Sequence, residues 1–204
     1  MVHSFNDKTN TIKWIGILTM TIDHIGYYLF PSVLGLRIIG RVAFPCFLYG
    51  IIEGTERTRN YPRYIFQLLL LGILSMPITP NTLNVLFLLV LFSLSLKYPK
   101  YFILFLSLSI FVEYNIYGFL FGWALWWMKK QDKKQGMLAS VFVQFLSFSI
   151  IQPFSLLALP LLNSKKGLKL PRLPKYFFYF YYPIHQIILM RLVKWNLFGL
   201  LLNQ

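Results

Sequence analysis

The stretch that decides the fold runs from Ile12 to Phe30 and reads IKWIGILTMTIDHIGYYLF. Its length approaches the roughly 20 apolar residues with which a helix crosses the hydrocarbon core of a bilayer. Asp23 and His24 nevertheless lie inside it, and an Asp at the middle of a membrane helix costs roughly 2.5–3.5 kcal/mol on insertion. Because ionisable side chains in such positions are functional by default, we expect a membrane helix that carries part of a functional site.

The composition places the rest of the chain in the same class. The 204 residues are 57% hydrophobic and 19% aromatic, with a mean hydropathy of +0.60, which is more apolar than a soluble domain of this length. We therefore expect one all-α domain over residues 1–204, a polytopic transmembrane helical bundle. The sequence contains about nine apolar segments, roughly 12–30, 36–52, 63–78, 82–96, 101–112, 114–128, 137–151, 153–162 and 176–198.

Cysteine content and charge exclude other classes. The single cysteine, Cys46, rules out an intrachain disulfide, and the sequence lacks the paired-cysteine spacing of a metal site, so no metal is expected. The formal net charge is +14, but the basic residues cluster between the apolar runs. That pattern is typical of loops beside anionic membrane lipid, and no nucleic-acid partner is expected.

The distribution of the basic residues predicts the orientation. They precede the first segment and then occupy every second loop, at Lys8 and Lys13, Arg57 to Arg63, Lys97 and Lys100, Lys129 to Lys134, and Lys165 to Lys175. Because positively charged loops stay in the cytoplasm, we expect a cytoplasmic N-terminus and an external C-terminus. The 137–162 region could form one bent span instead of two.

Polar residues of the first two segments are predicted to share a depth. A helix rises 1.5 Å per residue, which puts His24 about 9 Å and Arg41 about 8 Å below the outer membrane face. Arg37 and Arg41 share a helix face because they are four residues apart, and Lys13 shares a face with His24 because eleven residues make about three turns. Asp23 points about 100° away from His24, so its expected partner is an arginine of the second segment.

Structural explanations stay open for each of these groups. Asp23 with an arginine could be a structural ion pair, and His24 could be a hydrogen-bonded packing residue. His185, which follows a proline in the last segment, could be structural or catalytic. Glu53 lies among arginines near the cytoplasmic end, where a solvated charge network is the ordinary explanation. Glu113, in an outer loop, is expected to be solvated.

Several motifs follow one another along the chain. They are Met20-Thr-Ile-Asp-His-Ile-Gly26, Leu36-Arg-Ile-Ile-Gly-Arg-Val-Ala-Phe-Pro45, Glu53-Gly-Thr-Glu-Arg-Thr-Arg-Asn60 with Arg63, Ser75-Met-Pro77, Asn84-Val-Leu-Phe87 and Phe180-Tyr-Tyr-Pro-Ile-His185. In this order they resemble the TraX family of membrane proteins, which is associated with N-terminal acetylation of conjugative pilin. The resemblance touches both ends of the chain and implies a multi-pass protein of the bacterial cytoplasmic membrane.

TraX-like proteins also look related to the acyltransferase-3 type of membrane acyltransferases. There, a basic residue recurs before a histidine in the first span, at a spacing that Lys13 and His24 fit. The paired arginines of that type are usually separated by two residues, whereas three separate Arg37 and Arg41 here. The resemblance implies acetyl-coenzyme A (acetyl-CoA) as donor, and binding roles are assigned to Lys13, Glu53, Arg57, Arg59, Arg63, Asn84 and His185.

The resemblance and the chemistry together predict an acetyltransferase. His24 suits the role of base, because a histidine titrates near neutral pH, and Arg37 or Arg41 could stabilise the carbonyl oxygen while Asp23 holds an arginine in place. The coenzyme is expected to approach from the cytoplasm and thread its pantetheine arm toward His24.

The expected acceptor is an amine or hydroxyl of an exported peptide or glycan, so the expected partners are this acceptor and membrane lipid. The alternative from another class is a proton- or anion-coupled transporter, or a non-catalytic membrane component of a conjugation or secretion apparatus.

Overall fold

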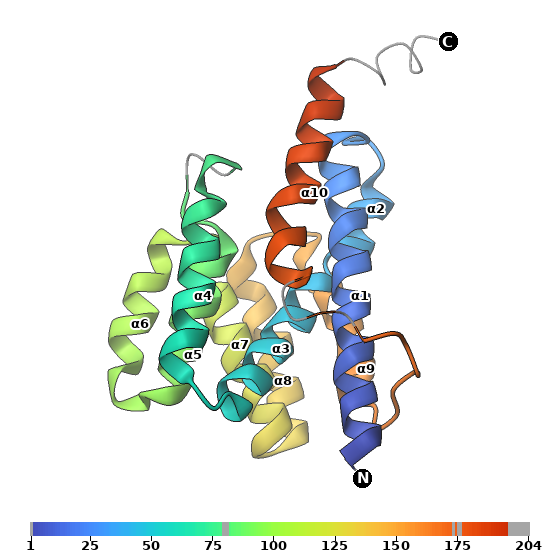
Figure 1. The fold of residues 1–204 in the computed structure, drawn as a ribbon. Coiled ribbons are helices and arrows are strands. Elements are labelled where there is room, and N and C mark those ends of the chain that lie inside the picture. Colours follow the sequence, from blue (N-terminus) through green and yellow to red (C-terminus); the bar gives the residue numbers. More distant parts are fainter. Residues whose placement is uncertain (1, 79–81, 173, 175–176, 196–204) are drawn as a thin grey trace.

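The computed structural model describes residues 2–78, 82–172, 174 and 177–195, and over these ranges the chain is mostly helical (Figure 1). The α-helices are α1 (Val2–Tyr28), α2 (Leu34–Gly40), α3 (Ala43–Arg57), α4 (Tyr61–Leu74), α5 (Val85–Lys97), α6 (Phe102–Leu108), α7 (Asn115–Lys130), α8 (Lys133–Val143), α9 (Leu159–Asn163) and α10 (Phe177–Lys194). The 3₁₀ segments are η1 (Met76–Ile78), η2 (Pro99–Tyr101), η3 (Ser109–Phe111), η4 (Gln144–Ser147) and η5 (Gln152–Ala158). The described ranges contain no strand apart from an isolated bridge between Leu83 and Val112, which confirms the all-α prediction.

The predicted apolar segments coincide with helical elements over the described residues; residues 176 and 196–198 of the last predicted segment lie outside them. The 36–52 segment is divided into α2 and α3 by a tight turn, in which the N–H groups of Arg41 and Val42 donate to carbonyls three residues back. The 137–162 region forms two pieces, α8 with η4 and η5 with α9, and the chain turns between them near Phe148, whose φ is 46°. Asn163 at the end of α9 reaches the sulfur of Met137 in α8, so the second piece returns to the level where the first began.

By length and composition, one helical stretch of the described residues could cross a membrane. This stretch, Leu34–Arg57, comprises α2 and α3, lies near the N-terminus and is a little more than half buried in the protein. The helices Tyr61–Leu74, Val85–Lys97 and Pro99–Phe111 are apolar but shorter. The expected number of crossings therefore stays a prediction.

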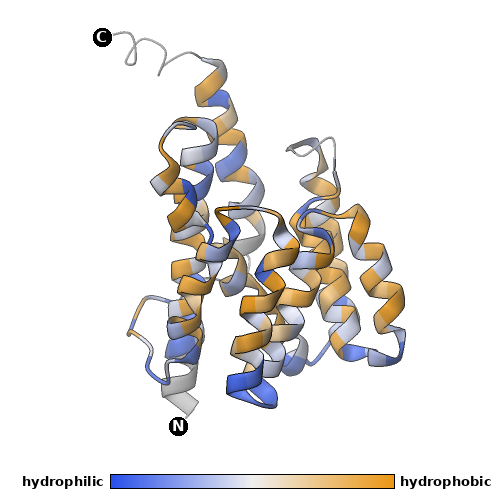
Figure 2. Ribbon diagram, turned by 180° about the vertical axis from the view of Figure 1, so that it is seen from behind, coloured by the Kyte–Doolittle hydropathy of each residue, from blue (hydrophilic) through white to orange (hydrophobic). Residues whose placement is uncertain are grey.

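Basic residues gather at one end of the bundle, which we call the basic end. There Lys8 of α1 donates to the Leu162 carbonyl across 2.8 Å, and Lys129 of α7 contacts Glu53 of α3. Figure 2 shows hydrophilic residues concentrated in the loops at this end. We call the opposite end, where Glu113 lies, the far end. Over the described residues, the basic loops of the sequence thus gather at the basic end, and the loops between them lie at the far end.

The core lies where α3, α5 and α7 meet. Leu48, Leu88 and Phe92 are completely buried there. Gly122 of α7 permits close approach to α5, because a Cβ atom at this position would lie 2.8 Å from the Phe92 ring. This packing fixes α3, which forms one wall of the site described below.

Large apolar side chains also cover much of the outer surface. Ile103, Phe111, Phe145, Phe148 and Ile150 are each at least 69% exposed. In Figure 2, hydrophobic residues follow the shafts of the helices on the outside of the bundle. Exposed apolar surface on this scale marks contact with lipid or with another protein.

Candidate functional site

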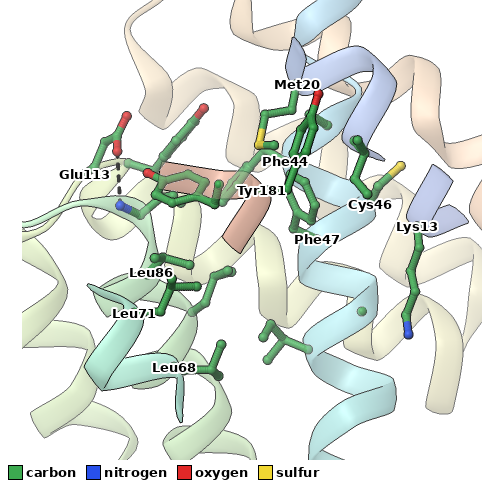
Figure 3. A pocket seen from close by; sticks show the side chains of 18 of the residues that line it. Lys13, Met20, Phe44, Cys46, Phe47, Leu68, Leu71, Leu86, Glu113 and Tyr181 are labelled. Atoms are coloured by element: carbon green, nitrogen blue, oxygen red, sulfur yellow. Dashed lines mark hydrogen bonds between the residues drawn. The ribbon is translucent and has the colours of Figure 1, made fainter. Parts of the chain in front are cut away.

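An elongated cavity of about 480 Å³ lies between α1, α3, α4, α5 and α10. Lys13 and His24 of α1 both line it, and their separation of eleven positions spans about 16.5 Å along a helix. Lys13 lies on the side of the basic end, whereas His24, Asp23 and Glu113 lie on the side of the far end. Figure 3 shows Glu113 and Lys13 on opposite sides of this space, with the Phe44 and Phe47 rings between them. The cavity is therefore largely apolar with ionisable groups at both ends, and we call it the apolar passage.

Two arginines hold the Asp23 carboxylate. Its Oδ2 lies 2.9 Å from Nη1 of Arg37, and its Oδ1 lies 2.5 Å from Nη2 of Arg41. Arg41 is buried, at 7% exposure, and also donates to Oε1 of Gln152 in η5 across 3.4 Å. The structure thus pairs Asp23 with arginines of the second predicted segment, as its direction on α1 indicates.

The close approach of α1 and α2 at Asp23 requires a glycine. A Cβ atom at position 40 would overlap the Asp23 side chain. Because Gly40 has no side chain, Asp23 can reach Arg37 and Arg41 from the neighbouring helix. Asp23 and Gly40 line the cavity, and the two arginines lie behind them. The arginines therefore act on the cavity mainly through Asp23 and through their charge.

His24 meets His185, although the depth of the two segments suggested Arg41 as its neighbour. Nδ1 of His24 lies 2.6 Å from Nε2 of His185, and Nδ1 of His185 lies 2.6 Å from the carbonyl oxygen of Tyr181. The two imidazole planes are inclined by only 18°. The contact has the length of a hydrogen bond. Within the described residues no group of three His, Cys, Asp or Glu side chains could hold a metal ion.

The histidine contact belongs to a polar seam between α1 and α10, which lie side by side in Figure 1. The hydroxyl groups of Thr21 and Tyr181 lie 2.6 Å apart, and Tyr28 donates to Gln186 across 3.5 Å. Residues that come later in α1 therefore contact residues that come later in α10, so the two helices run parallel. This parallel arrangement places the His185 motif against the His24 motif.

The predicted ligands at the basic end form a charge network. Glu53 contacts Arg57 across 2.9 Å and also contacts Lys129. Arg59 and Arg63 are exposed at the same end, and Lys13 reaches into the cavity. The structure thus confirms a charge network around Glu53, but Glu53 is buried, at 4% exposure, and is not solvated as expected. Arg59 and Arg63 face solvent.

Asn84 has a structural position. Its side chain is completely buried, its Oδ1 accepts from the N–H of Leu86 at the start of α5, and its Nδ2 donates to the Gly72 carbonyl of α4. A side-chain oxygen in this position caps the helix N-terminus. Asn84 therefore joins α4 to α5, and the binding role predicted for it finds no support in its contacts.

Glu113 and Tyr181 are cavity residues to which the sequence assigned no role in the site, although Tyr181 belongs to the last motif. The sequence predicts a solvated Glu113, and solvent does reach it, but it also lines the cavity and accepts from the N–H of Val85 across 3.0 Å. The surrounding protein removes part of its water and raises the pKa of this carboxyl group. No local signal placed either residue, because both depend on which helices become neighbours.

The fold and the site thus define a class of protein. It is all-α, and a cluster of His, Asp and Arg side chains lies at one end of its apolar passage. The chain belongs to the TraX family: the TraX protein family matches residues 8–193. This confirms the family resemblance found in the motifs. The relation to the acyltransferase-3 type stays an expectation.

Two curated proteins are similar to this chain, one over most of its length and one over a short part. A probable fimbrial assembly protein, FimC of serogroup H1, from Dichelobacter nodosus is 26% identical over 227 aligned positions, which cover 87% of this chain and 92% of the relative. An uncharacterized protein of Rickettsia prowazekii is 48% identical over 46 residues, which cover 21% of this chain and 18% of that protein. No solved structure matches.

Proposed function

We propose that this chain is an integral-membrane acetyltransferase that moves an acetyl group from cytoplasmic acetyl-CoA to an amine or hydroxyl of an exported acceptor. One observation carries the proposal: His24 lies at one end of an apolar passage, and Lys13 lies at the other. A base at the end of such a passage suits a reaction between a donor and an acceptor that arrive from opposite sides of a membrane.

The membrane setting is supported by the distribution of apolar and basic residues. Apolar side chains such as Phe145 and Phe148 face outward, and basic residues collect at one end, as cytoplasmic loops do. In this setting the basic end faces the cytoplasm and the far end faces the outside. On this proposal the chain forms the roughly nine membrane segments expected from the sequence, several of them too short to cross upright.

The passage suits the donor that the family resemblance implies. Exposed Arg59 and Arg63 lie near its cytoplasmic side and can attract phosphate groups. The apolar walls formed by Phe47, Leu68 and their neighbours suit a slender, largely uncharged arm. When bound, acetyl-CoA supplies a thioester whose carbonyl carbon is open to attack.

The far end supplies a base and a positive charge. His24 is placed to take a proton from the acceptor. Asp23 with Arg37 and Arg41 carries a net charge of +1, because one carboxylate faces two guanidinium groups. This charge favours the negative charge that develops on the carbonyl oxygen.

The similarity to a probable fimbrial assembly protein supports a pilus-related acceptor, and it equally favours a second candidate. In that candidate the chain is a non-catalytic membrane component of a pilus or conjugation apparatus. A transporter is the third alternative, in which the polar cluster would relay protons or anions.

Purified protein in lipid vesicles separates these candidates. The vesicles receive acetyl-CoA carrying a labelled acetyl group, together with either a peptide that has a free N-terminal amine or an oligosaccharide. We expect label on one of the two acceptors and release of the coenzyme thiol. If the folded protein neither transfers nor hydrolyses the acetyl group, the enzyme proposal fails. A proton or anion flux under the same conditions would then support a transporter.

A further inference from the structure

Two consecutive contacts determine where the protons of the two histidines lie. The carbonyl oxygen of Tyr181 is 2.6 Å from Nδ1 of His185, and Nε2 of His185 is 2.6 Å from Nδ1 of His24. The ring centroids of the histidines are 4.9 Å apart. Since the two nitrogens are much closer than the centroids and the planes are nearly parallel, these nitrogens point at each other. The contact is therefore an edge-to-edge hydrogen bond.

The first contact fixes the proton of His185. A carbonyl oxygen only accepts hydrogen bonds, so Nδ1 of His185 must carry a proton. In a neutral imidazole the other nitrogen is then bare and can only accept. Nε2 of His185 therefore accepts from Nδ1–H of His24. It follows that Nε2 of His24 is bare.

A charged His185 would reverse the second bond, but its surroundings disfavour that state. The residue is only 7% exposed, and neither of its two ring-nitrogen contacts is with a carboxylate. The nearest carboxylate in the cluster, Asp23, is already shared by Arg37 and Arg41. A buried cation without a counterion is costly, so the neutral arrangement is the stable one.

We infer that His185 is a positioning residue, which holds His24 in the Nδ1–H tautomer and leaves Nε2 of His24 bare on the opposite edge of the ring. His24 lines the cavity, whereas His185 is not among the lining residues and contacts the Nδ1 edge of the His24 ring. The tautomer stands on the contacts alone, and only its catalytic consequence rests on the proposed function. The backbone carbonyl of Tyr181 sets the direction of both hydrogen bonds, because it can only accept.

The consequence for acetyl transfer is a defined route for one proton. Nε2 of His24 takes the proton as the acceptor nitrogen or oxygen forms its bond to the acetyl carbon. It then returns that proton to the sulfur when the carbon–sulfur bond breaks. Throughout, Nδ1–H of His24 keeps donating to His185, so the protonated ring stays oriented and its charge is partly dispersed.

The test is nitrogen-15 NMR of the histidine side chains in the protein without donor or acceptor. The chain has three histidines, so His3→Gln and His185→Gln variants assign the signals. At neutral pH we expect Nδ1 of His24 to be protonated and Nε2 to be bare, with the same pattern in His185. A protonated Nε2 in His24, or a doubly protonated ring in either residue, overturns the inference.

Variants add a functional readout that a purely structural role would not give. His185→Phe removes the acceptor and should lower kcat at least tenfold with little change in the KM for acetyl-CoA. His185→Gln keeps an acceptor oxygen and should restore part of kcat. Tyr28→Phe, which removes another bond of the same seam, should change neither kcat nor the His24 tautomer. Equal kcat values in wild type and the folded His185 variants contradict the positioning role, whereas an inactive wild type with the expected tautomer contradicts only the proposed function.

Discussion

His24 and His185 face each other through ring nitrogens 2.6 Å apart, although 161 positions separate them in the chain. The contact joins α1 to α10 and lies beside the Asp23 ion pairs with Arg37 and Arg41. Two polar clusters that come from different parts of the sequence therefore meet at one end of the cavity. The predictions below test each part of this arrangement.

Asp23→Asn should strongly destabilise the protein. The change leaves Arg37 and the buried Arg41 without their carboxylate, and breaking a buried ion pair by removing one partner costs about 3–5 kcal/mol. The measurement is thermal or denaturant unfolding in a fixed detergent.

Arg57→Gln is the matched control for this change. It also removes an ion pair, but the Arg57 side chain is 54% exposed, and its buried partner Glu53 keeps the contact with Lys129. No charge is then left buried without a partner, so we expect a cost of about 0–1 kcal/mol, as for pairs open to solvent. Equal effects of the two substitutions would mean that the Asp23 cluster has no special place in the fold.

Gly40→Ala should disturb the site through packing alone. The new methyl group would overlap Asp23, and overpacking of this kind costs about 1–3 kcal/mol. Gly35→Ala in the same helix is the control, because a Cβ atom there meets nothing within 4 Å. We expect a lower unfolding temperature and weaker acetyl transfer for Gly40→Ala, and no change in either for Gly35→Ala. A fully stable and active Gly40→Ala protein would rule out the close approach of α1 and α2.

Gly50→Leu should block the passage without damaging the fold. Gly50 lines the cavity, and a Cβ atom there meets nothing within 4 Å, so the larger side chain extends into open space. In a helix it also replaces the poorly helix-forming glycine. We expect unchanged or higher thermal stability, with at least a tenfold rise in the KM for acetyl-CoA.

Gly35→Leu, at an exposed and equally open position, should leave the KM for acetyl-CoA unchanged. If Gly50→Leu is folded and keeps the wild-type KM, the donor does not use this cavity.

A double Arg59→Gln, Arg63→Gln variant should weaken donor binding through electrostatics. Both residues are exposed near the start of α4, where they can attract the phosphates of the coenzyme. We expect a several-fold rise in the KM for acetyl-CoA that shrinks as salt is raised, because exposed charges are screened. A Lys165→Gln, Lys166→Gln variant removes the same charge from another loop and should have little effect. The same KM change in both double variants would indicate a general charge effect.

The sequence predicted the parts of the site that depend on neighbouring segments. Asp23 was assigned an arginine of the second segment as partner because it points about 100° away from His24 on the first helix. The pairing with Arg37 and Arg41 agrees with that reasoning. Local geometry was sufficient here, since few arrangements of two adjacent helices are possible.

The sequence did not predict contacts between distant segments. His185 was recognised as part of a motif, but hydrophobic patterns do not say which helices lie side by side, so its contact with His24 was missed. Asn84 also belongs to a motif, and its two backbone hydrogen bonds give that position a structural explanation. Glu113 joined the cavity because its loop lies against the start of α5, which no local pattern indicates.

The most direct test of the central claim is labelled-acetyl transfer by wild type and His24→Ala protein in lipid vesicles. Leu18→Ala is the matched control, since Leu18 lies on the same helix and is 54% exposed. A missing general base typically costs about 10²–10⁴-fold in rate, so we expect that loss for His24→Ala and wild-type transfer for Leu18→Ala. Full transfer by a correctly folded His24→Ala protein would contradict the account.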